Sequence, residues 1–332
     1  MKVEGIKAER MKEKSINISV VIPLYNKQNA IVTTLESVLT QTYTNYEVIV
    51  VDDGSTDDSA RVVEEFMKNS PSFQGGDRGK LIRKSNGGVC SARNRGIQEA
   101  KYDYIALLDG DDLWDEHYLE EQVKLIQDFP EAKMWGVNYA DIYNGKIIPY
   151  QQGVADDFRG YVQNYFGTKH GDLFWTSAVV IDKSVFSVVG FFDERIAYSE
   201  DMDMWYRIIL KEKVAYHNKV LTFYNKDAEN RAEGDLTVHF DIYKCLDYYI
   251  DKYVSYFAEN KSFSKFINLY VVWNILGKNY YWGNDYDRRA TDKIVSYLDF
   301  SILPWKYYVI FKSPRCIGRC IYKLSKLIQK IK

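Results

Sequence analysis

The 332-residue sequence has few cysteines and no long apolar run. Its four cysteines, Cys90, Cys245, Cys316 and Cys320, are scattered, and no pair has the spacing of a zinc site. No apolar stretch approaches the roughly 20 residues that a membrane-spanning helix needs. The charged residues 1–15 have no apolar core, so they predict neither a signal peptide nor a membrane anchor. We therefore expect a cytoplasmic protein with reduced thiols.

Two common nucleotide-binding motifs are also missing. No Gly-x-Gly-x-x-Gly follows the first predicted strand, and there is no P-loop lysine. Dinucleotide binding and ATP hydrolysis therefore lose support. The composition, 46% apolar and 27% charged, is that of an ordinary soluble globular protein.

The first two thirds of the sequence alternate between strand and helix patterns, which predicts an α/β fold with a mostly parallel sheet and helices on both faces. Strands are predicted at 16–24, 46–51, 80–84, 104–108, 135–143, 174–181 and 214–224. Helices are predicted at 30–41, 55–68, 90–101, 115–128 and from Glu200 onward.

After the last predicted strand, 214–224, the sequence no longer has strand patterns, and this change predicts a domain boundary. We expect a leader at 1–16, a catalytic domain at 17–225, a helical appendage at 226–299 and a basic amphipathic tail at 300–332. Because the tail holds eight Lys or Arg and no acidic residue, the rest of the chain has 36 basic against 46 acidic residues.

Polar clusters follow three of the predicted strands. Each alone could be a turn or a helix cap, but parallel strands bring their carboxyl ends to one edge, where ligands bind in such sheets. The clusters are Pro23, Tyr25 and Asn26; Asp52, Asp53, Gly54 and Ser55; and Asp109, Gly110, Asp111 and Asp112.

The third cluster places three carboxylates within four positions. Like charges this close resist ionisation, and a helix cap does not require three of them. Oxygen ligands so arranged suit a hard divalent cation, Mg²⁺ or Mn²⁺, that keeps positions open for phosphate oxygens. We therefore interpret Asp109, Asp111 and Asp112 as a metal site that holds a diphosphate.

At these residues the sequence resembles glycosyltransferase family 2, inverting enzymes of the GT-A fold. The resemblance runs through SVVIPLYN (19–26), SVLTQTYTNYEVIVVDDGSTDDS (37–59), NGGVCSARNRG (86–96), YIALLDGDD (104–112) and SEDMDMWYR (199–207). It covers residues 17 to 225 well and is weak afterwards. No role is carried onto Asn230 or Arg231, where the sequence departs from the family pattern.

The resemblance implies a role for each matched position. Asp201 would be the catalytic base, and Glu200 would contact the acceptor; the alternative is that both only open a helix. Asp53, Pro23, Tyr25 and Asn26 would bind the donor nucleotide. Arg93 would lie beside the nucleotide, or else be an exposed helix arginine. Asp111 and Asp112 would face the ribose and the metal, and Asp109 would complete the Asp-x-Asp motif; family members differ in which of the three touches the ion directly.

Other residues near these motifs are interpreted as structural. His217 lies within a strand pattern, although some relatives use a late histidine as a metal ligand. Met204, Trp205 and Ile208 are predicted to be core residues.

The resemblance implies metal-assisted transfer of a hexosyl or N-acetylhexosaminyl group from a nucleoside diphosphate donor to a glycan or lipid-linked glycan hydroxyl. We expect the donor to be a UDP-sugar. One alternative is a sugar-1-phosphate nucleotidyltransferase, which needs a glycine-rich loop after the first strand; the segment PLYNKQNA at that position is not glycine-rich. The other alternative is a membrane-bound scaffold without activity. Nucleic-acid binding is not expected, because the basic residues lie on an amphipathic tail rather than in an aromatic groove.

The tail predicts a helix with one apolar and one basic side, which suits an anionic membrane surface at about 1 kcal/mol per basic residue. The alternative is a helix docked on the protein body or a partner. The apolar side has Ile317, Cys320, Ile321, Leu324, Leu327, Ile328 and Ile331; the basic side has Arg315, Arg319, Lys323, Lys326 and Lys330.

Deletion of residues 300–332 should therefore reduce binding to anionic vesicles. Sedimentation with vesicles rich in acidic lipid measures this, and vesicles of neutral lipid are the control. Unchanged sedimentation of the shortened protein would leave the docked helix as the better interpretation.

Overall fold

The computed structural model of the chain describes residues 15–73, 78–167, 173–196, 199–229, most of 252–278, and residues 301 and 309. The chain divides into two compact units. The first contains residues 1–162, 171–195 and 199–231, and the second contains residues 163–170, 196–198 and 232–332. Apart from residues 301 and 309, the predicted basic tail lies outside the described residues.

One ten-stranded sheet forms the centre of the first unit, in the order β3-β2-β1-β4-β9-β6-β10-β5, with β7 beside β6 and β8 beside β10. Its first half is parallel and matches the predicted strands to within two residues. These strands are β1 (Ile18–Leu24), β2 (Tyr46–Asp52), β3 (Gly79–Arg83) and β4 (Tyr104–Leu107). Every residue of β1 and β2 is buried, as expected for strands covered on both faces.

The second half of the sheet is mixed. β6 and β10 run parallel to each other, while β9 is antiparallel to both of its neighbours, β4 and β6. Its strands are β5 (Leu113–Trp114), β6 (Ala132–Tyr143), β7 (Lys146–Pro149), β8 (Arg159–Tyr161), β9 (Val179–Asp182) and β10 (Lys213–Asn225). The strand predicted over 174–181 begins only at Val179, because residues 176–178 form the short helix η3 (Thr176–Ala178).

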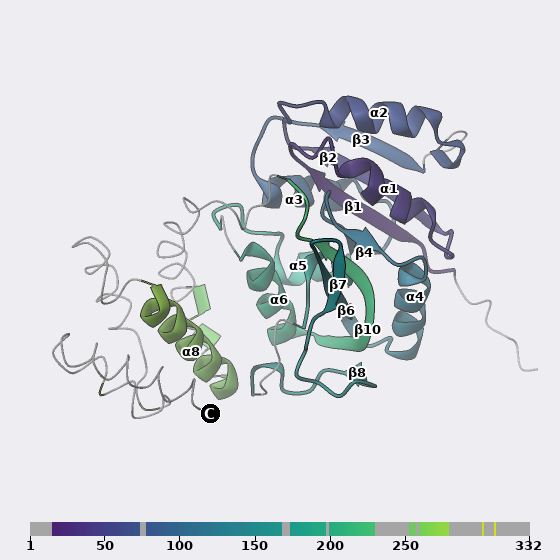
Figure 1. The fold of residues 1–332 in the computed structure, drawn as a ribbon. Helices are drawn as coiled ribbons and strands as arrows, with labels where there is room; N and C mark the ends of the chain where they lie inside the picture. Colours follow the sequence, from purple (N-terminus) through teal and green to yellow (C-terminus); the bar gives the residue numbers. More distant parts are fainter. Residues whose placement is uncertain are drawn as a thin grey trace, which may run out of the picture. The chain divides into compact units, whose positions relative to one another are not determined.

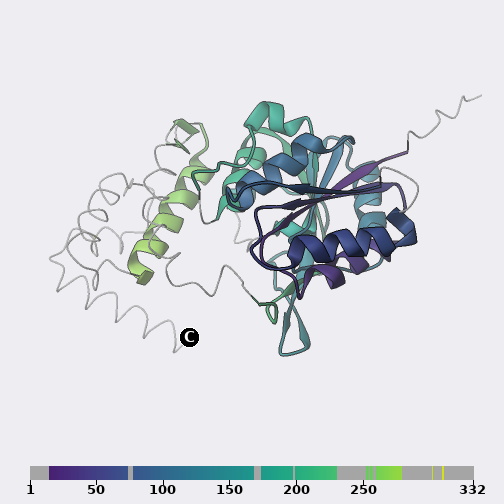
Figure 2. The same ribbon diagram turned by 90° about the horizontal axis from the view of Figure 1, so that it is seen from above.

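Helices cover the sheet on both sides (Figures 1 and 2). α1 and α2 pack against each other and, together with α4, on the face to which Val20 and Ile22 point. α3 packs on β1 and β2 from the opposite face. The helices are α1 (Ile31–Leu39), α2 (Ser59–Asn69), α3 (Val89–Glu99), α4 (Tyr118–Asp128), α5 (Val185–Val189) and α6 (Glu200–Lys211), with the short η1 (Pro71–Phe73).

Two helices begin a few residues later than the sequence predicts. The helix predicted over 55–68 begins only at Ser59, because Ser55 lies in the loop, where its hydroxyl accepts a hydrogen bond from the Asn26 backbone. α4 begins at Tyr118, and Asp115 accepts a hydrogen bond from the backbone of His117 just before it.

In the second unit the structure describes η2 (Tyr165–Gly167) and α8 (Lys261–Lys278). The rings of Phe166 and Phe263 pack edge to face at 4.6 Å, and Tyr253 lies 5.3 Å from Phe263. Among the helices within the described ranges, none combines the length and apolar character needed to cross a membrane.

Candidate active site

The loops that follow β1 and β2 are bound to each other. The Asn26 side chain accepts a hydrogen bond from the Thr56 backbone at 2.8 Å, and its own backbone N–H donates to Ser55. Asn26 has a φ of 51°, a left-handed conformation that is uncommon for residues other than glycine. Tyr25 is exposed beside it, and Pro23 is buried at the end of β1. The first two predicted clusters therefore do lie together at one edge of the sheet.

Asp53 lies at this edge, and three residues donate hydrogen bonds to its carboxylate. Its carboxylate accepts from the backbone N–H groups of Gly87 and Gly88, and the Lys84 ammonium lies 2.5 Å from it. The segment Asn86–Gly88 is thus folded over the end of β2. Gly54 permits this close approach, because a Cβ there would lie 2.8 Å from the backbone nitrogen of Asn86. The sequence interpretation missed Lys84, which it treated only as part of a strand.

The three carboxylates of the third cluster have different surroundings. Asp109 pairs with Arg93 at 2.8 Å, and Asp111 pairs with Lys27 at 2.6 Å. Asp112 is buried, and burial together with its neighbours Asp111 and Asp109 raises its pKa well above the usual range.

Asp112 is held by groups from elements far along the chain. It accepts hydrogen bonds from the Ser177 hydroxyl at 2.6 Å, the Trp175 indole N–H at 3.2 Å and the Asn225 backbone at 3.2 Å. Its carboxylate therefore lies in the interior, bound by these three donors. In the part of the chain that the structure describes, no three His, Cys, Asp or Glu side chains are grouped so that they could hold a metal ion.

Arg93 is buried rather than exposed. Its side chain is 3% exposed, and its guanidinium bridges Asp109 at 2.8 Å and Glu200 at 2.7 Å. The ring of Phe192 lies 5.5 Å from it. The alternative of an exposed helix arginine is therefore wrong, because Arg93 faces the sheet side of α3 and joins the loop after β4 to the start of α6.

Asp201 lies in the first turn of α6. Its carboxylate accepts hydrogen bonds from the Thr176 hydroxyl at 3.2 Å and from the Met202 backbone at 2.8 Å. Burial and the neighbouring Glu200 carboxylate raise its pKa to about 7, although Arg93 acts in the opposite direction. Ser199, which precedes the helix, has a φ of 58°. A proton acceptor poised near neutral pH is typical of a general base.

A second buried ion pair joins α6 to the segment that follows α5. Asp203 and Arg207 pair at 2.8 Å, and the Arg207 guanidinium also donates to the carbonyls of Val189, Gly190 and Phe191. The sequence interpretation missed this pair, although the spacing of four residues on a helix favours it.

The residues interpreted as structural lie where expected. Met204, Trp205 and Ile208 are fully buried. His217 lies within β10, and its nearest ionic partner is Glu121 of α4 at 3.7 Å.

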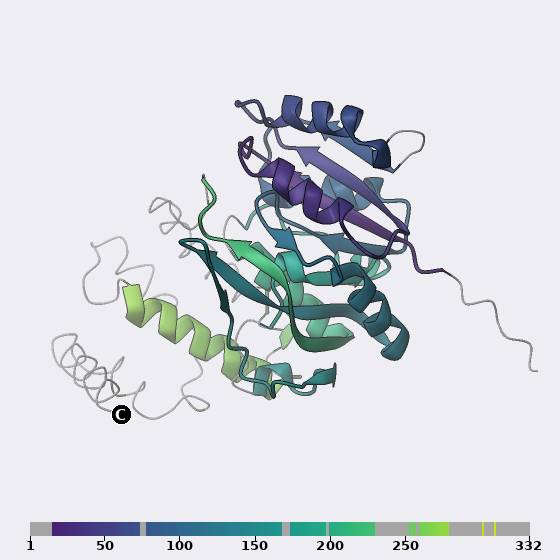
Figure 3. The same cartoon turned by 45° about the vertical axis from the view of Figure 1, so that its right-hand side comes forward.

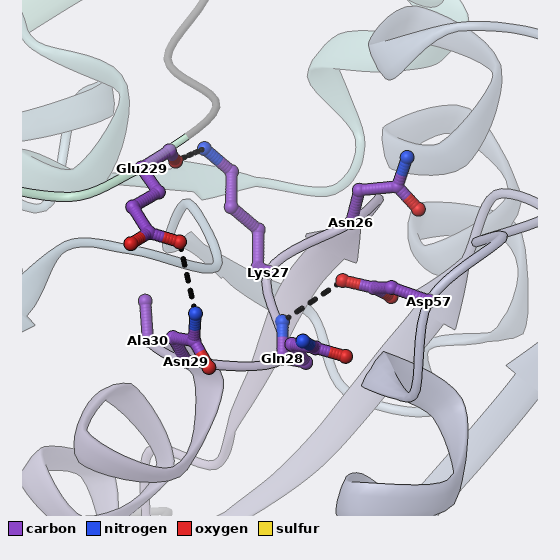
Figure 4. A pocket seen from close by; sticks show the side chains of 7 residues that line it. All are labelled: Asn26, Lys27, Gln28, Asn29, Ala30, Asp57 and Glu229. Carbon is purple, nitrogen blue, oxygen red and sulfur yellow. Dashed lines mark hydrogen bonds between the residues drawn. The ribbon is translucent and has the colours of Figure 1, made fainter.

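A polar cavity of about 160 Å³ opens between the loop after β1 and the segment that follows β10 (Figure 4). The Lys27 ammonium donates to the Glu229 carbonyl at 3.3 Å, and the Asn29 amide donates to the Glu229 carboxylate at 2.9 Å. The Gln28 backbone donates to Asp57. The cavity is lined by Asn26, Lys27, Gln28, Asn29, Ala30, Asp57 and Glu229.

Comparison of the whole structure with solved structures identifies the fold. The structure of residues 1–349 of TarS from S. aureus, in complex with UDP-GlcNAc, superposes with a TM-score of 0.72 at 17% identity, covering 92% of this chain and 89% of that one. GalNAc-T7 with UDP, GalNAc and Mn²⁺ superposes with a TM-score of 0.52 at 18% identity, over 65% of this chain and 45% of that one. The protein has the GT-A fold of glycosyltransferases, which confirms the predicted α/β class.

The sequence comparisons give the family. Residues 19–189 match the model of glycosyl transferase family 2, so the chain belongs to that family and is a glycosyltransferase. Glycosyltransferase GlyG of Streptococcus pneumoniae is 31% identical over 239 residues, which cover 68% of this chain and 76% of GlyG. An uncharacterized glycosyltransferase of Rickettsia typhi is 29% identical over 61% of this chain and 62% of its own length. This membership sets aside the nucleotidyltransferase and scaffold alternatives.

Replacement of Arg93 by Met should destabilise the protein by about 3 kcal/mol, because it leaves the partly buried carboxylates of Asp109 and Glu200 without their shared cation. Urea unfolding at pH 7 measures the change. The control is Arg95→Met on the same helix, where a pair with Glu99 is half exposed and about 0–1 kcal/mol is expected. Equal losses from both variants would contradict the bridging role of Arg93.

Proposed function

We propose that the protein transfers a sugar with inversion from a nucleoside diphosphate donor, a UDP-sugar, to a hydroxyl of a glycan or lipid-linked glycan. The observation that carries this proposal is the position and pKa of Asp201. Its carboxylate lies at the start of a helix fixed from both sides, and it is bound through Thr176 to the segment that also holds Asp112. A pKa of about 7 lets it accept a proton at neutral pH.

In this proposal Asp201 removes the proton of the acceptor hydroxyl as that oxygen attacks the anomeric carbon of the donor. The bond from the anomeric carbon to the diphosphate oxygen breaks in the same step, and the nucleoside diphosphate leaves. Attack from the opposite side inverts the anomeric centre, so no nucleophilic side chain is needed. Glu200 would lie on the acceptor side of Asp201.

The nucleotide would bind at the edge formed by Pro23, Tyr25, Asn26 and Asp53. Support comes from the convergence of these residues and from neighbours of known structure: TarS was solved with UDP-GlcNAc and with UDP, and GalNAc-T7 with UDP. Arg93 is buried, and its Nη1 and Nη2 groups donate to Glu200 and Asp109. We therefore assign Arg93 a positioning role rather than direct contact with the nucleotide.

Asp109 and Asp111 fit a divalent cation by donor chemistry, since both supply carboxylate oxygens at the edge. In the structure these oxygens are paired with Arg93 and Lys27, which would compete with a cation for them. The inward-facing Asp112 does not fit as a third ligand. A bound Mn²⁺ or Mg²⁺ would neutralise the charge that develops on the departing diphosphate. For the cation to reach Asp111, the Lys27 ammonium would have to move away.

The remaining parts of the proposal concern location. We propose that residues 17–225 form the catalytic domain, that residues 226–299 form a helical appendage, and that the basic tail binds the inner face of the plasma membrane. A polyprenyl-linked glycan would suit an enzyme attached there. Support comes from the sequence pattern of the tail.

The donor and metal roles can be tested by thermal melting with UDP, GDP or dTDP, and with Mn²⁺ or EDTA. UDP with Mn²⁺ should raise the melting temperature, and EDTA should remove most of the rise. Asp111→Asn should abolish the Mn²⁺-dependent part. Asp115→Asn is the matched control, because Asp115 follows the same loop and its carboxylate accepts a hydrogen bond from the His117 backbone. If only GDP or dTDP raises the melting temperature, the donor is a sugar linked to that nucleotide instead of UDP, and the proposed mechanism is unaffected.

Asp201→Asn should lower transfer by about 10²–10⁴-fold while nucleotide affinity stays nearly unchanged. In the unchanged protein, transfer should increase as the pH rises through about 7, where Asp201 loses its proton. Initial rates between pH 5.5 and 8.5 and nucleotide titrations measure both effects. A variant that still transfers at the original rate would exclude Asp201 as the base.

The same substitution has an effect on stability with a defined sign. Because the folded protein raises the pKa of Asp201, the stability contributed by the protonated form is lost as the pH rises toward about 7. Asp201→Asn should therefore melt at a higher temperature than the original protein above pH 7, and the difference should shrink toward pH 4.

A further inference from the structure

One face of the mixed half of the sheet carries a stack of aromatic rings. Tyr139 of β6 lies between Tyr150 and Trp175, with ring centroids 4.7 and 5.2 Å apart. Tyr224 of β10 adds a fourth ring, 4.6 Å from Trp175. Stacked rings of this kind hold one another in fixed orientations.

The strand register extends this face outward along the β6–β7 hairpin. Tyr139, Asp141 and Tyr143 alternate onto the same face of β6, and Asp141 lies opposite Ile148 of β7. The large apolar side chains exposed on this face are Tyr143 at 53%, Ile148 at 49% and Tyr150 at 36%. We call the side chains of Tyr139, Tyr143, Ile148, Tyr150, Trp175 and Tyr224 the aromatic strip.

The inner end of the aromatic strip lies at the candidate catalytic residues. The Trp175 indole donates to Asp112, and the next residue, Thr176, donates to Asp201. From Tyr139 to Tyr143 the strip extends about 13 Å away from this point at the usual rise of a strand. This is longer than one sugar ring.

The hairpin that carries the outer end is held in place. Its turn residues Asn144 and Gly145 both donate backbone hydrogen bonds to the Asp227 carboxylate, at 2.8 and 2.9 Å. Lys226 pairs with Asp141 at 2.7 Å on the face of the strip. Figure 3 shows the hairpin beside the end of β10, from which residues 226–227 follow. A surface fixed in this way loses little freedom when a ligand binds.

We propose that the aromatic strip binds the acceptor as an oligosaccharide of at least two sugars. This inference rests on the proposed function. The reacting hydroxyl would lie at Asp201, and the rest of the glycan would extend over Tyr150, Ile148 and Tyr143. Sugar rings present apolar C–H faces that pack on aromatic rings, and their hydroxyls would bond with Asp141 and Lys226.

The chemistry of the strip favours a glycan over a protein partner. The strip has three exposed apolar side chains, Tyr143, Ile148 and Tyr150, whereas a stable protein interface uses roughly 20–30 residues on each side. An ion pair within the apolar surface also suits a ligand rich in hydroxyls. The enzyme would accordingly extend an existing chain rather than modify a single sugar.

Calorimetric titration of the full chain with chito- and malto-oligosaccharides, from monosaccharide to tetrasaccharide, tests the proposal. At least one series should bind more tightly with each added sugar. The double variant Tyr143→Ser/Tyr150→Ala should weaken tetrasaccharide binding roughly tenfold and leave the monosaccharide nearly unaffected. Ile147→Ser is the matched control, because Ile147 is 60% exposed on the same hairpin but faces the other way.

UDP titration of each variant separates this inference from the proposed function. If UDP binds but the double variant holds the tetrasaccharide as tightly as the original protein, or if neither series binds, the aromatic strip is not the acceptor site. If UDP and the other nucleotides all fail to bind, the proposed function itself is overturned. Equal weakening by Ile147→Ser would point to a damaged hairpin and would also contradict the proposal.

Discussion

The buried guanidinium of Arg93 is the interaction on which the arrangement of the site depends. It pairs with Asp109 in the loop after β4 and with Glu200 at the start of α6, two segments separated by more than 90 positions in the chain. Removing an arginine from water is costly, and only partners on both sides make it favourable. The neighbouring residue Asn94 joins the same region by exchanging hydrogen bonds with the backbone of Phe192. α3 therefore fixes the distance between the proposed metal-binding loop and the proposed base.

This constraint explains why five carboxylates can share one small region. Arg93 balances Asp109 and Glu200, and Lys27 balances Asp111. Asp112 and Asp201 have no ion-pair partner within 4.0 Å among the described residues, and each is held by hydroxyl and backbone donors instead. Those two carboxyl groups are the ones whose pKa burial raises most. The close carboxylates that would attract a divalent cation, together with burial, thus also raise the pKa of Asp201 into the range of a base.

The mixed half of the sheet supplies the residues that hold Asp112 and Asp201. Because β9 runs antiparallel between β4 and β6, the segment before it delivers Trp175, Thr176 and Ser177 directly beneath the loop after β4. Ser177 and Trp175 hold Asp112, while Thr176 holds Asp201. One short helical turn therefore links the proposed donor side to the proposed acceptor side, and the aromatic strip begins at the same turn.

The sequence by itself determined the alternating strands and helices of the first half, the shared edge of the three clusters and the family. These features depend on local periodicity and on motifs that are contiguous in the chain. Tertiary structure alone decided the partners of the carboxylates: Lys27 with Asp111, Lys84 with Asp53, and the inward turn of Asp112. It also decided that Arg93 is internal and that 176–178 is a helical turn rather than strand. Pairing of side chains dozens of positions apart depends on how the elements pack, and no periodicity in a single sequence records that packing.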